Sequence, residues 1–284
     1  MSEVVMRCPA CSSEKLRSIY QRESHGKTWE LAKCGECEQQ FTTPFPTASE
    51  IAGFYAGDYH GELRHSGDSE AAFGGKYRRY TNWVKQFVAS GGRTLDVGCS
   101  TGLLVKMLKD EGYRAEGVEF NERSVEWGKS NYGVSLRCGG LDTLPLETAA
   151  YDLVSLTDVL EHTENPLENL KKVRGLLRAS GHALITFPDI DSFESRYLWH
   201  LSRVLGRGWL WATCHIPLHT WEFTPATARR MFSKAGFEVV GFRRSSARET
   251  SADPKLRVLM APTKVVDWLP GLLGTQMEFM LRRV

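Results

Sequence analysis

The sequence lacks several features that would assign it to a class at once. It has no uninterrupted apolar run of the about 18 residues that a membrane-spanning helix needs. Residues 1–6 lack the basic and then apolar pattern of an export signal, so we expect a cytoplasmic protein. The formal net charge is only +2, which indicates no particular partner. In a reducing compartment, the 7 cysteines are expected to be thiols or metal ligands and not disulfides.

The Gly-x-Gly-x-x-Gly fingerprint of dinucleotide binders is missing from the turn at Gly98–Gly102. This turn follows a short β-type run, Thr94–Val97, and precedes an amphipathic helical pattern from Leu103. A strand, a glycine loop and a helix start point backbone N–H groups at a polar or anionic ligand. A second β-type run ends at Glu119, where nucleotide-binding sheets place a carboxylate that binds ribose hydroxyls. The loop offers few donors for a pyrophosphate, so we expect a single nucleoside with an amino-acid tail.

These segments resemble the class I S-adenosylmethionine-dependent methyltransferases, and the resemblance covers about Tyr77 to Val284. It rests on Leu95-Asp96-Val97-Gly98-Cys99-Ser100-Thr101-Gly102, on Gly117-Val118-Glu119, and on Tyr151–Val154 with Asp158–His162. It implies a Rossmann-like α/β sheet of seven strands, the last one antiparallel, with helices on both faces. It also implies S-adenosylmethionine as cofactor and S-adenosylhomocysteine as product. The residues then expected to hold the cofactor are Asp96, Gly98, Ser100, Gly102, Glu119, Leu141, Asp142 and Thr157. For Asp142, a turn residue that caps its own backbone is the alternative.

Two Cys-x-x-Cys pairs near the N-terminus predict a metal site. Cys8, Cys11, Cys34 and Cys37 offer four thiolates, which suit a structural zinc ion with no open position for substrate. The stretch between the pairs looks like a hairpin, so residues 1–45 are expected to form a zinc ribbon. Four unrelated cysteines or a redox pair are the alternatives. Residues 1–60 carry six basic and eight acidic side chains, which disfavours a nucleic-acid-binding ribbon. We expect the ribbon to pack on the catalytic domain or to shape its mouth.

Residues 46–92 are interpreted as a helical lead-in and lid before the methyltransferase domain at 93–284. A short helix is expected near 49–54, then a polar lid over Gly61–Gly75, then an amphipathic helix over Lys76–Ala89. The ribbon, a proline and the Tyr55-x-x-x-Tyr59 pattern resemble the lead-in of bacterial methyltransferases from polysaccharide and natural-product pathways. The two tyrosines could line the site or could be packing residues.

Capping residues mark several helix boundaries in the second half of the chain. Asn121 and Asn165 are expected N-caps, and Thr224 with Pro225 starts a helix that ends near Gly236. Gly181 is expected to end the helix that follows Asn165, before a strand at His182–Phe187.

An aromatic and basic insertion at 188–224 is expected to cap the substrate site. Its aromatic side chains could stack on sugars or form a packed cap, and we favour the cap as architecture. If the acceptor is a hydroxyl, a base is needed to take its proton. From its position in the sequence, His219 is the first candidate for this base, and His162 and Asp158 are the next. For His219, a hydrogen bond to the loop backbone is an equal alternative.

The sequence therefore predicts methyl transfer from S-adenosylmethionine to a small molecule or saccharide. The expected reaction is O-methylation in polysaccharide or natural-product biosynthesis. One alternative is an RNA base methyltransferase with a zinc module, which the acidic ribbon disfavours. The other is a non-catalytic methyltransferase-like binding protein, which the intact Asp96, Gly98, Gly102 and Glu119 disfavour.

Overall fold

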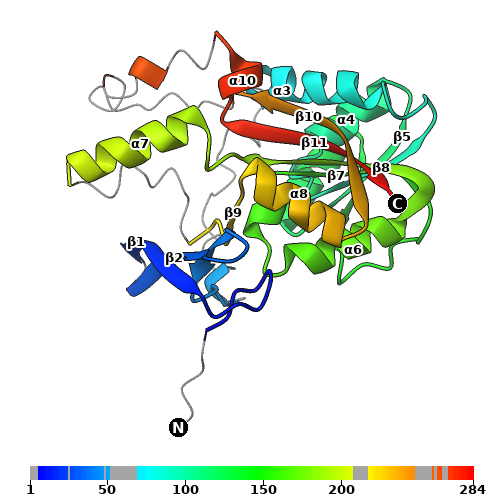
Figure 1. The fold of residues 1–284 in the computed structure, drawn as a ribbon. Helices are drawn as coiled ribbons and strands as arrows, with labels where there is room; N and C mark the ends of the chain where they lie inside the picture. Colours follow the sequence, from blue (N-terminus) through cyan, green and yellow to red (C-terminus); the bar gives the residue numbers. More distant parts are fainter. Residues whose placement is uncertain are drawn as a thin grey trace.

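The computed structural model describes residues 6–24, 26–47, 49–51, 69–206, 217–246, 258, 261–263 and 268–284. It contains a large sheet flanked by helices and a small sheet built from the N-terminal segment (Figure 1). Within these residues, no helix is long and apolar enough to cross a bilayer. The end of the predicted short helix and the pattern of Tyr55 and Tyr59 lie outside the described residues. So do Trp209 and Trp211 of the aromatic insertion.

The large sheet has seven strands in the order β10-β11-β8-β7-β4-β5-β6. The strands β4, β5, β6, β7 and β8 pair in parallel, whereas β11 pairs antiparallel with both β8 and β10. The predicted sheet with an antiparallel last strand is confirmed. The bounds are β4 Arg93–Val97, β5 Arg114–Glu119, β6 Ser135–Cys138, β7 Tyr151–Thr157, β8 Leu177–Pro188, β10 Phe237–Ser245 and β11 Gln276–Arg283.

Helices cover both faces of this sheet (Figure 1). The apolar sides of α3 and α4 pack with Leu153, Leu184 and Met280 on one face, and α6 and α8 pack with Ile185 and Phe187 on the other. The helix α5 packs beside α4. The helix bounds are α3 Ser69–Val84, α4 Leu103–Asp110, α5 Glu122–Tyr132, α6 Pro166–Leu176, α7 Phe193–Val204, α8 Pro225–Lys234 and α10 Pro270–Leu273, with a 3₁₀ turn η1 at Leu160–His162.

The three predicted N-caps are confirmed. Asn121, Asn165 and Thr224 each accept a hydrogen bond from a backbone N–H in the first turn of α5, α6 and α8. These caps satisfy donors that the helix itself leaves unpaired.

The predicted bounds of two helices were wrong. The helix α3 begins at Ser69, so residues 69–75 of the predicted lid are helical, and it ends at Val84 instead of Ala89. The helix α6 ends at Leu176, and Gly181 lies within β8. Leu177 already pairs with Tyr151, and the register then shifts before His182 pairs with Leu153. A Cβ at Gly181 would lie 3.0 Å from the carbonyl oxygen of Tyr151, so the glycine serves the close approach of two strands instead of a helix end.

The small sheet has four strands in the order β1-β2-β3-β9. Three come from the N-terminal segment: β1 Leu16–Ser24, β2 Lys27–Cys34 and β3 Gln40–Thr43. The fourth, β9 at Trp221–Glu222, comes from the end of the insertion in the methyltransferase part. Phe41 pairs with Trp221 across β3 and β9. The ribbon therefore shares a sheet with a segment that lies far along the chain. The side-chain amide of Gln39 also donates to the carbonyl oxygen of Glu222, 183 residues later.

Gly128 in α5 lies against the loop that follows β4. A Cβ there would be 2.2 Å from the carbonyl oxygen of Thr101 and 2.7 Å from Leu136. Alanine normally favours a helix over glycine by about 1 kcal/mol, but overpacking costs about 1–3 kcal/mol and the obstacle here is backbone. We therefore expect Gly128→Ala to lower the urea midpoint of unfolding.

Gly75→Ala is the matched control, because Gly75 is also helical and has no atom within 4 Å of its added Cβ. This variant should keep or raise the midpoint. Equal midpoints for the two variants would contradict close packing of α5 on the loop.

Candidate active site

The loop after β4 has the conformation that the glycine pattern predicts. Gly98 and Gly102 have φ of 72° and 79°, and Ser100 also has a positive φ of 51°. A Cβ at Gly98 would lie 2.6 Å from Cγ2 of Val159, so no larger residue fits that turn without displacement. The helix α4 begins directly after Gly102. The loop thus presents backbone and a helix start at the carboxyl edge of the sheet, where ligands of open α/β sheets bind.

Glu119 ends β5 and its carboxylate reaches the loop. One carboxylate oxygen accepts a hydrogen bond from the backbone N–H of Ser100 at 2.9 Å, and the other accepts from that of Asn121 at 2.9 Å. The residue is 8% exposed. These bonds fix the orientation of the carboxylate, and each oxygen keeps acceptor capacity for a ligand hydroxyl.

Asp96 supplies a second buried carboxyl group next to the loop. It accepts a hydrogen bond from Oγ of Ser155 at 2.6 Å. Burial raises the pKa of Asp96 to about 7, the bond from Ser155 opposes this, and the charge of Glu119 adds to it. A cationic ligand group would relieve this cost, because an opposite charge favours the ionised form. Oγ of Ser100 is buried and has no hydrogen-bond partner among the described residues. These are the features expected of a pocket for a nucleoside with a charged amino-acid tail.

The remaining predicted cofactor residues lie at the end of β7 and in the segment that follows β6. Thr157 ends β7 and is buried, and Leu141 is half-buried after Gly140. Asp142 is exposed and forms an ion pair with Lys172 of α6, an interaction that the sequence did not suggest.

Phe120 is a residue that the sequence reasoning missed. It follows Glu119 directly and is 73% exposed, and its ring lies against Gly140, where a Cβ would be 2.3 Å from Cζ. Its position one residue after the acidic end of a strand was the available signal.

Asp158 lies directly after β7, with a positive φ of 58°. Its carboxylate pairs with Nζ of Lys76 at 2.5 Å and accepts hydrogen bonds from Gln276 and Thr186. Burial alone would raise the pKa of Asp158, but the Lys76 ammonium outweighs it and holds the pKa below its usual value. The carboxylate is therefore ionised and poorly suited to take a proton at neutral pH. Lys76 was read from the sequence only as a helix residue.

His162 and His219 face each other. Their ring centroids are 4.7 Å apart with an interplanar angle of 79°. Nδ1 of His162 donates to the carbonyl oxygen of Leu218 at 2.9 Å, and Nδ1 of His219 lies 3.5 Å from Oε1 of Glu222. Burial lowers the pKa of His219 to about 4, so its imidazole is neutral and keeps a lone pair at neutral pH.

Two tryptophans of the aromatic insertion, Trp199 and Trp221, serve as packing residues. Trp221 is 2% exposed and lies between Phe41 and Phe45 of the N-terminal segment, at centroid distances of 6.2 and 5.8 Å. Trp199 of α7 packs against Trp29 of β2. For these two tryptophans a packed cap is the observed arrangement, and Trp221 is not available to stack on a sugar.

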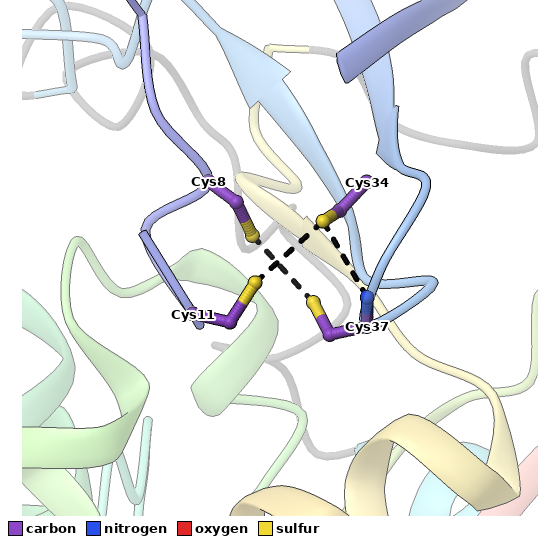
Figure 2. Close-up of side chains that lie close together, drawn as sticks. All are labelled: Cys8, Cys11, Cys34 and Cys37. Atoms are coloured by element: carbon purple, nitrogen blue, oxygen red, sulfur yellow. Dashed lines mark hydrogen bonds between the residues drawn. The ribbon is translucent and has the colours of Figure 1, made fainter. Parts of the chain in front are cut away.

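The four N-terminal cysteines converge on one point (Figure 2). The sulfur atoms of Cys8 and Cys37 are 3.6 Å apart, as are those of Cys11 and Cys34. Sulfurs around a tetrahedral zinc ion with Zn–S bonds of about 2.3 Å lie about 3.8 Å apart. Ser12 and Glu38, which follow the second cysteine of each pair, have φ of 63° and 60°. Two matching turns and a sulfur tetrahedron are compatible with a zinc ribbon.

The ribbon packs on the methyltransferase part, as predicted. The guanidinium of Arg230 in α8 donates to the carbonyl oxygen of Cys37, and Nζ of Lys234 donates to that of Ala10 at 2.9 Å. Oγ1 of Thr42 donates to the carbonyl oxygen of His219 at 2.8 Å. The ribbon therefore holds the backbone of a candidate catalytic residue.

A family model described as a methyltransferase domain matches residues 73–241. The chain belongs to this methyltransferase family. The match begins inside α3 and ends inside β10, so it contains the loop after β4 and both histidines. The resemblance to S-adenosylmethionine-dependent methyltransferases is confirmed.

Curated relatives agree with this family. A "Probable S-adenosylmethionine-dependent methyltransferase" of Mycolicibacterium smegmatis is 28% identical over 151 residues, which cover 53% of each protein. A ubiquinone biosynthesis O-methyltransferase of Coxiella burnetii is 26% identical over 120 residues, which cover 40% of this chain and 50% of the relative. The chain spans about half the length of these relatives.

Solved methyltransferases share the fold. The 1,6-didemethyltoxoflavin-N1-methyltransferase of Burkholderia thailandensis, solved with bound 1,6-didemethyltoxoflavin and S-adenosylhomocysteine, has a TM-score of 0.56 at 16% identity. The alignment covers 94% of this chain and all of that one. A methyltransferase of Archaeoglobus fulgidus has a TM-score of 0.54 at 18% identity, over 80% of this chain and all of that one. At these identities the likeness concerns the architecture alone.

Proposed function

We propose that this protein is a cytoplasmic enzyme that transfers a methyl group from S-adenosylmethionine to an oxygen atom of a small molecule or saccharide, in polysaccharide or natural-product biosynthesis. The observation that carries the proposal is the fixed carboxylate of Glu119 beside the loop of Gly98 and Ser100. When bound, S-adenosylmethionine supplies a methyl group that its sulfonium has already activated.

The residues of the crevice have distinct parts in this proposal. Glu119 accepts from the ribose hydroxyls, and Gly98 and Gly102 let the cofactor approach the backbone. Asp96 balances positive charge in the amino-acid tail, and Thr157 borders that tail. Leu141 and Asp142 border the adenine, and the exposed ring of Phe120 offers it a flat apolar surface.

On the acceptor side, His219, His162 and Asp158 are the proposed contacts. The chain must hold the acceptor oxygen in line with the methyl group, about 3 Å away, and exclude water. As the hydroxyl loses its proton, a neutral imidazole can receive it. His219 is the first choice because its imidazole is neutral at neutral pH, whereas Asp158 is already paired with Lys76.

The four cysteines are proposed to bind a structural zinc ion. Four thiolates would fill the four positions of a tetrahedral zinc ion, so the metal would supply folding energy and no catalytic position.

The proposal is tested by pairing cofactor binding with turnover. Wild-type protein should bind S-adenosylmethionine in calorimetry and release S-adenosylhomocysteine in the presence of a hydroxylated acceptor from a panel of sugars and phenols. His219→Ala should keep the affinity for the cofactor and lose turnover by about 10²-fold or more.

His182→Ala is the control, because His182 pairs with Leu153 in the middle of the sheet, whereas Thr186 pairs with Thr157 at the carboxyl end of β7. Unchanged turnover in His219→Ala would remove that residue from the reaction. Absence of cofactor binding by the wild type would favour a non-catalytic binding protein. Salt-sensitive retention on an RNA column would favour the RNA base methyltransferase.

A further inference from the structure

We propose that Glu161, His162 and His219 form a second metal site, distinct from the cysteine cluster, which binds a divalent first-row transition-metal ion at the acceptor side of the crevice. The three side chains come from η1 and from the segment just before β9. One ligand atom from each can be chosen so that all three lie within 4.8 Å of one another.

The spacing is close to that of a bound ion. Oε1 of Glu161 lies 4.0 Å from Nε2 of His162. Ligand atoms on one ion with bonds of about 2.0–2.2 Å are separated by about 3–4 Å. The three ligand atoms therefore lie within a few tenths of an ångström to about 1 Å of the separations on one cation.

The buried carboxylate of Glu161 points to a ligand. Glu161 is 2% exposed, and neither of its oxygens has a hydrogen-bond partner among the described residues. Buried carboxylates are normally hydrogen-bonded or paired, because an uncompensated charge in the interior is costly. A cation held between Glu161 and the two imidazoles satisfies this group.

The histidines are oriented as metal ligands. A carbonyl oxygen cannot donate, so the contact with Leu218 places the proton of His162 on Nδ1 and leaves a lone pair on Nε2, the atom that faces Glu161. Oε1 of the Glu222 carboxylate lies 3.5 Å from Nδ1 of His219, on the side of the ring away from a ligand bound at Nε2. Ligating histidines typically donate their second ring N–H to a carbonyl or carboxylate, which fixes the ring.

Two imidazoles and one carboxylate favour zinc, iron, cobalt or manganese and leave coordination positions open. The catalytic consequence rests on the proposed function. An acceptor hydroxyl on the cation has a lowered pKa, as metal-bound water does, and loses its proton to solvent water. Its oxygen then forms the bond to the methyl carbon while the carbon–sulfur bond breaks and S-adenosylhomocysteine leaves. In that case the histidines act as ligands and not as bases.

The test uses the full-length protein with its cysteine site loaded with zinc. Co²⁺ is added and followed by equilibrium dialysis and visible absorption, because cobalt bound to nitrogen and oxygen lacks the sulfur-to-cobalt charge-transfer bands of a cysteine site. We expect one bound Co²⁺ per chain without those bands. Glu161→Gln and His162→Ala should each weaken this binding by at least about 100-fold, since loss of a mere outer-shell partner costs 10–100-fold.

Glu168→Gln is the control, because Glu168 is an exposed glutamate on the neighbouring helix α6. Each variant is also checked for S-adenosylmethionine binding, which should remain and shows that the chain is folded. Co²⁺ should raise the thermal midpoint of the wild type but not that of the nearly isosteric Glu161→Gln.

Absence of Co²⁺ binding in the wild type, or binding that Glu161→Gln and His162→Ala leave unchanged, would overturn the second site. Methyl transfer that proceeds without added metal in such a protein would then leave the proposed function standing with His219 as base. Conversely, Co²⁺ binding without any methyl transfer would refute the function and leave the site in place.

Discussion

Glu119→Ala should abolish measurable binding of S-adenosylmethionine. The carboxylate is fixed by two backbone N–H groups and is the proposed acceptor for the ribose hydroxyls. Hydrogen bonds to a charged group contribute about 1.5–3 kcal/mol each, so two lost bonds remove at least about 3 kcal/mol, or about 100-fold in affinity. The variant also leaves the N–H of Ser100 without its acceptor, which loosens the loop itself. Isothermal titration calorimetry measures the effect.

Glu122→Ala is the matched control, since Glu122 is the same residue type three positions later and is exposed on α5. Its affinity should equal that of the wild type. Glu119→Gln should fall between the two, because the amide keeps one acceptor oxygen. Wild-type affinity in Glu119→Ala would show that the ribose does not bind at the end of β5.

Cys34→Ser should unfold the ribbon and thereby impair turnover in a site that it does not line. The sulfur of Cys34 is one of four in the cluster and accepts weak hydrogen bonds from the N–H groups of Glu36 and Cys37. Structural zinc contributes about 10–16 kcal/mol in small zinc-finger peptides, far more than so small a core can replace. Loss of β3 then removes the partner strand of β9 and the bond from Thr42 to the carbonyl oxygen of His219.

Hydrogen exchange should show lost protection in residues 16–43 and also in 219–222. Turnover should fall more than ten-fold, whereas cofactor affinity should change little because Glu119 ends β5 and Gly98 directly follows β4, both in the large sheet. Glu36→Ala is the control. Glu36 lies in the same turn, and its side chain forms an exposed ion pair with Lys15. Full protection of β9 in Cys34→Ser would contradict the coupling.

The parts predicted well from the sequence are those that local chemistry determines. The caps at Asn121, Asn165 and Thr224 and the glycine turn at Gly98 depend on neighbouring residues, so their patterns could be recognised without the fold. The same holds for the two cysteine pairs, whose spacing is itself the signal.

The parts that were missed depend on contacts between distant segments. The pair of Lys76 and Asp158 joins α3 to the end of β7, and a helix pattern says nothing about which lysine will meet a carboxylate. The pairing of β3 with β9 needs only two residues in β9, too few for a strand pattern. Gly181 was misread because a glycine after a helix usually marks its end, whereas here a close approach to Tyr151 requires it.

The shared sheet of β3 and β9 has a consequence for dissecting the chain. A fragment that starts at residue 46 contains the whole family match, yet it would lack Phe41 and Phe45 and uncover Trp221, which is 2% exposed in the intact chain. It would also present β9 as an unpaired edge beside that tryptophan, the combination from which chains aggregate. A well-behaved fragment must therefore keep the N-terminal strands together with β9, and the family boundary is not a physical one.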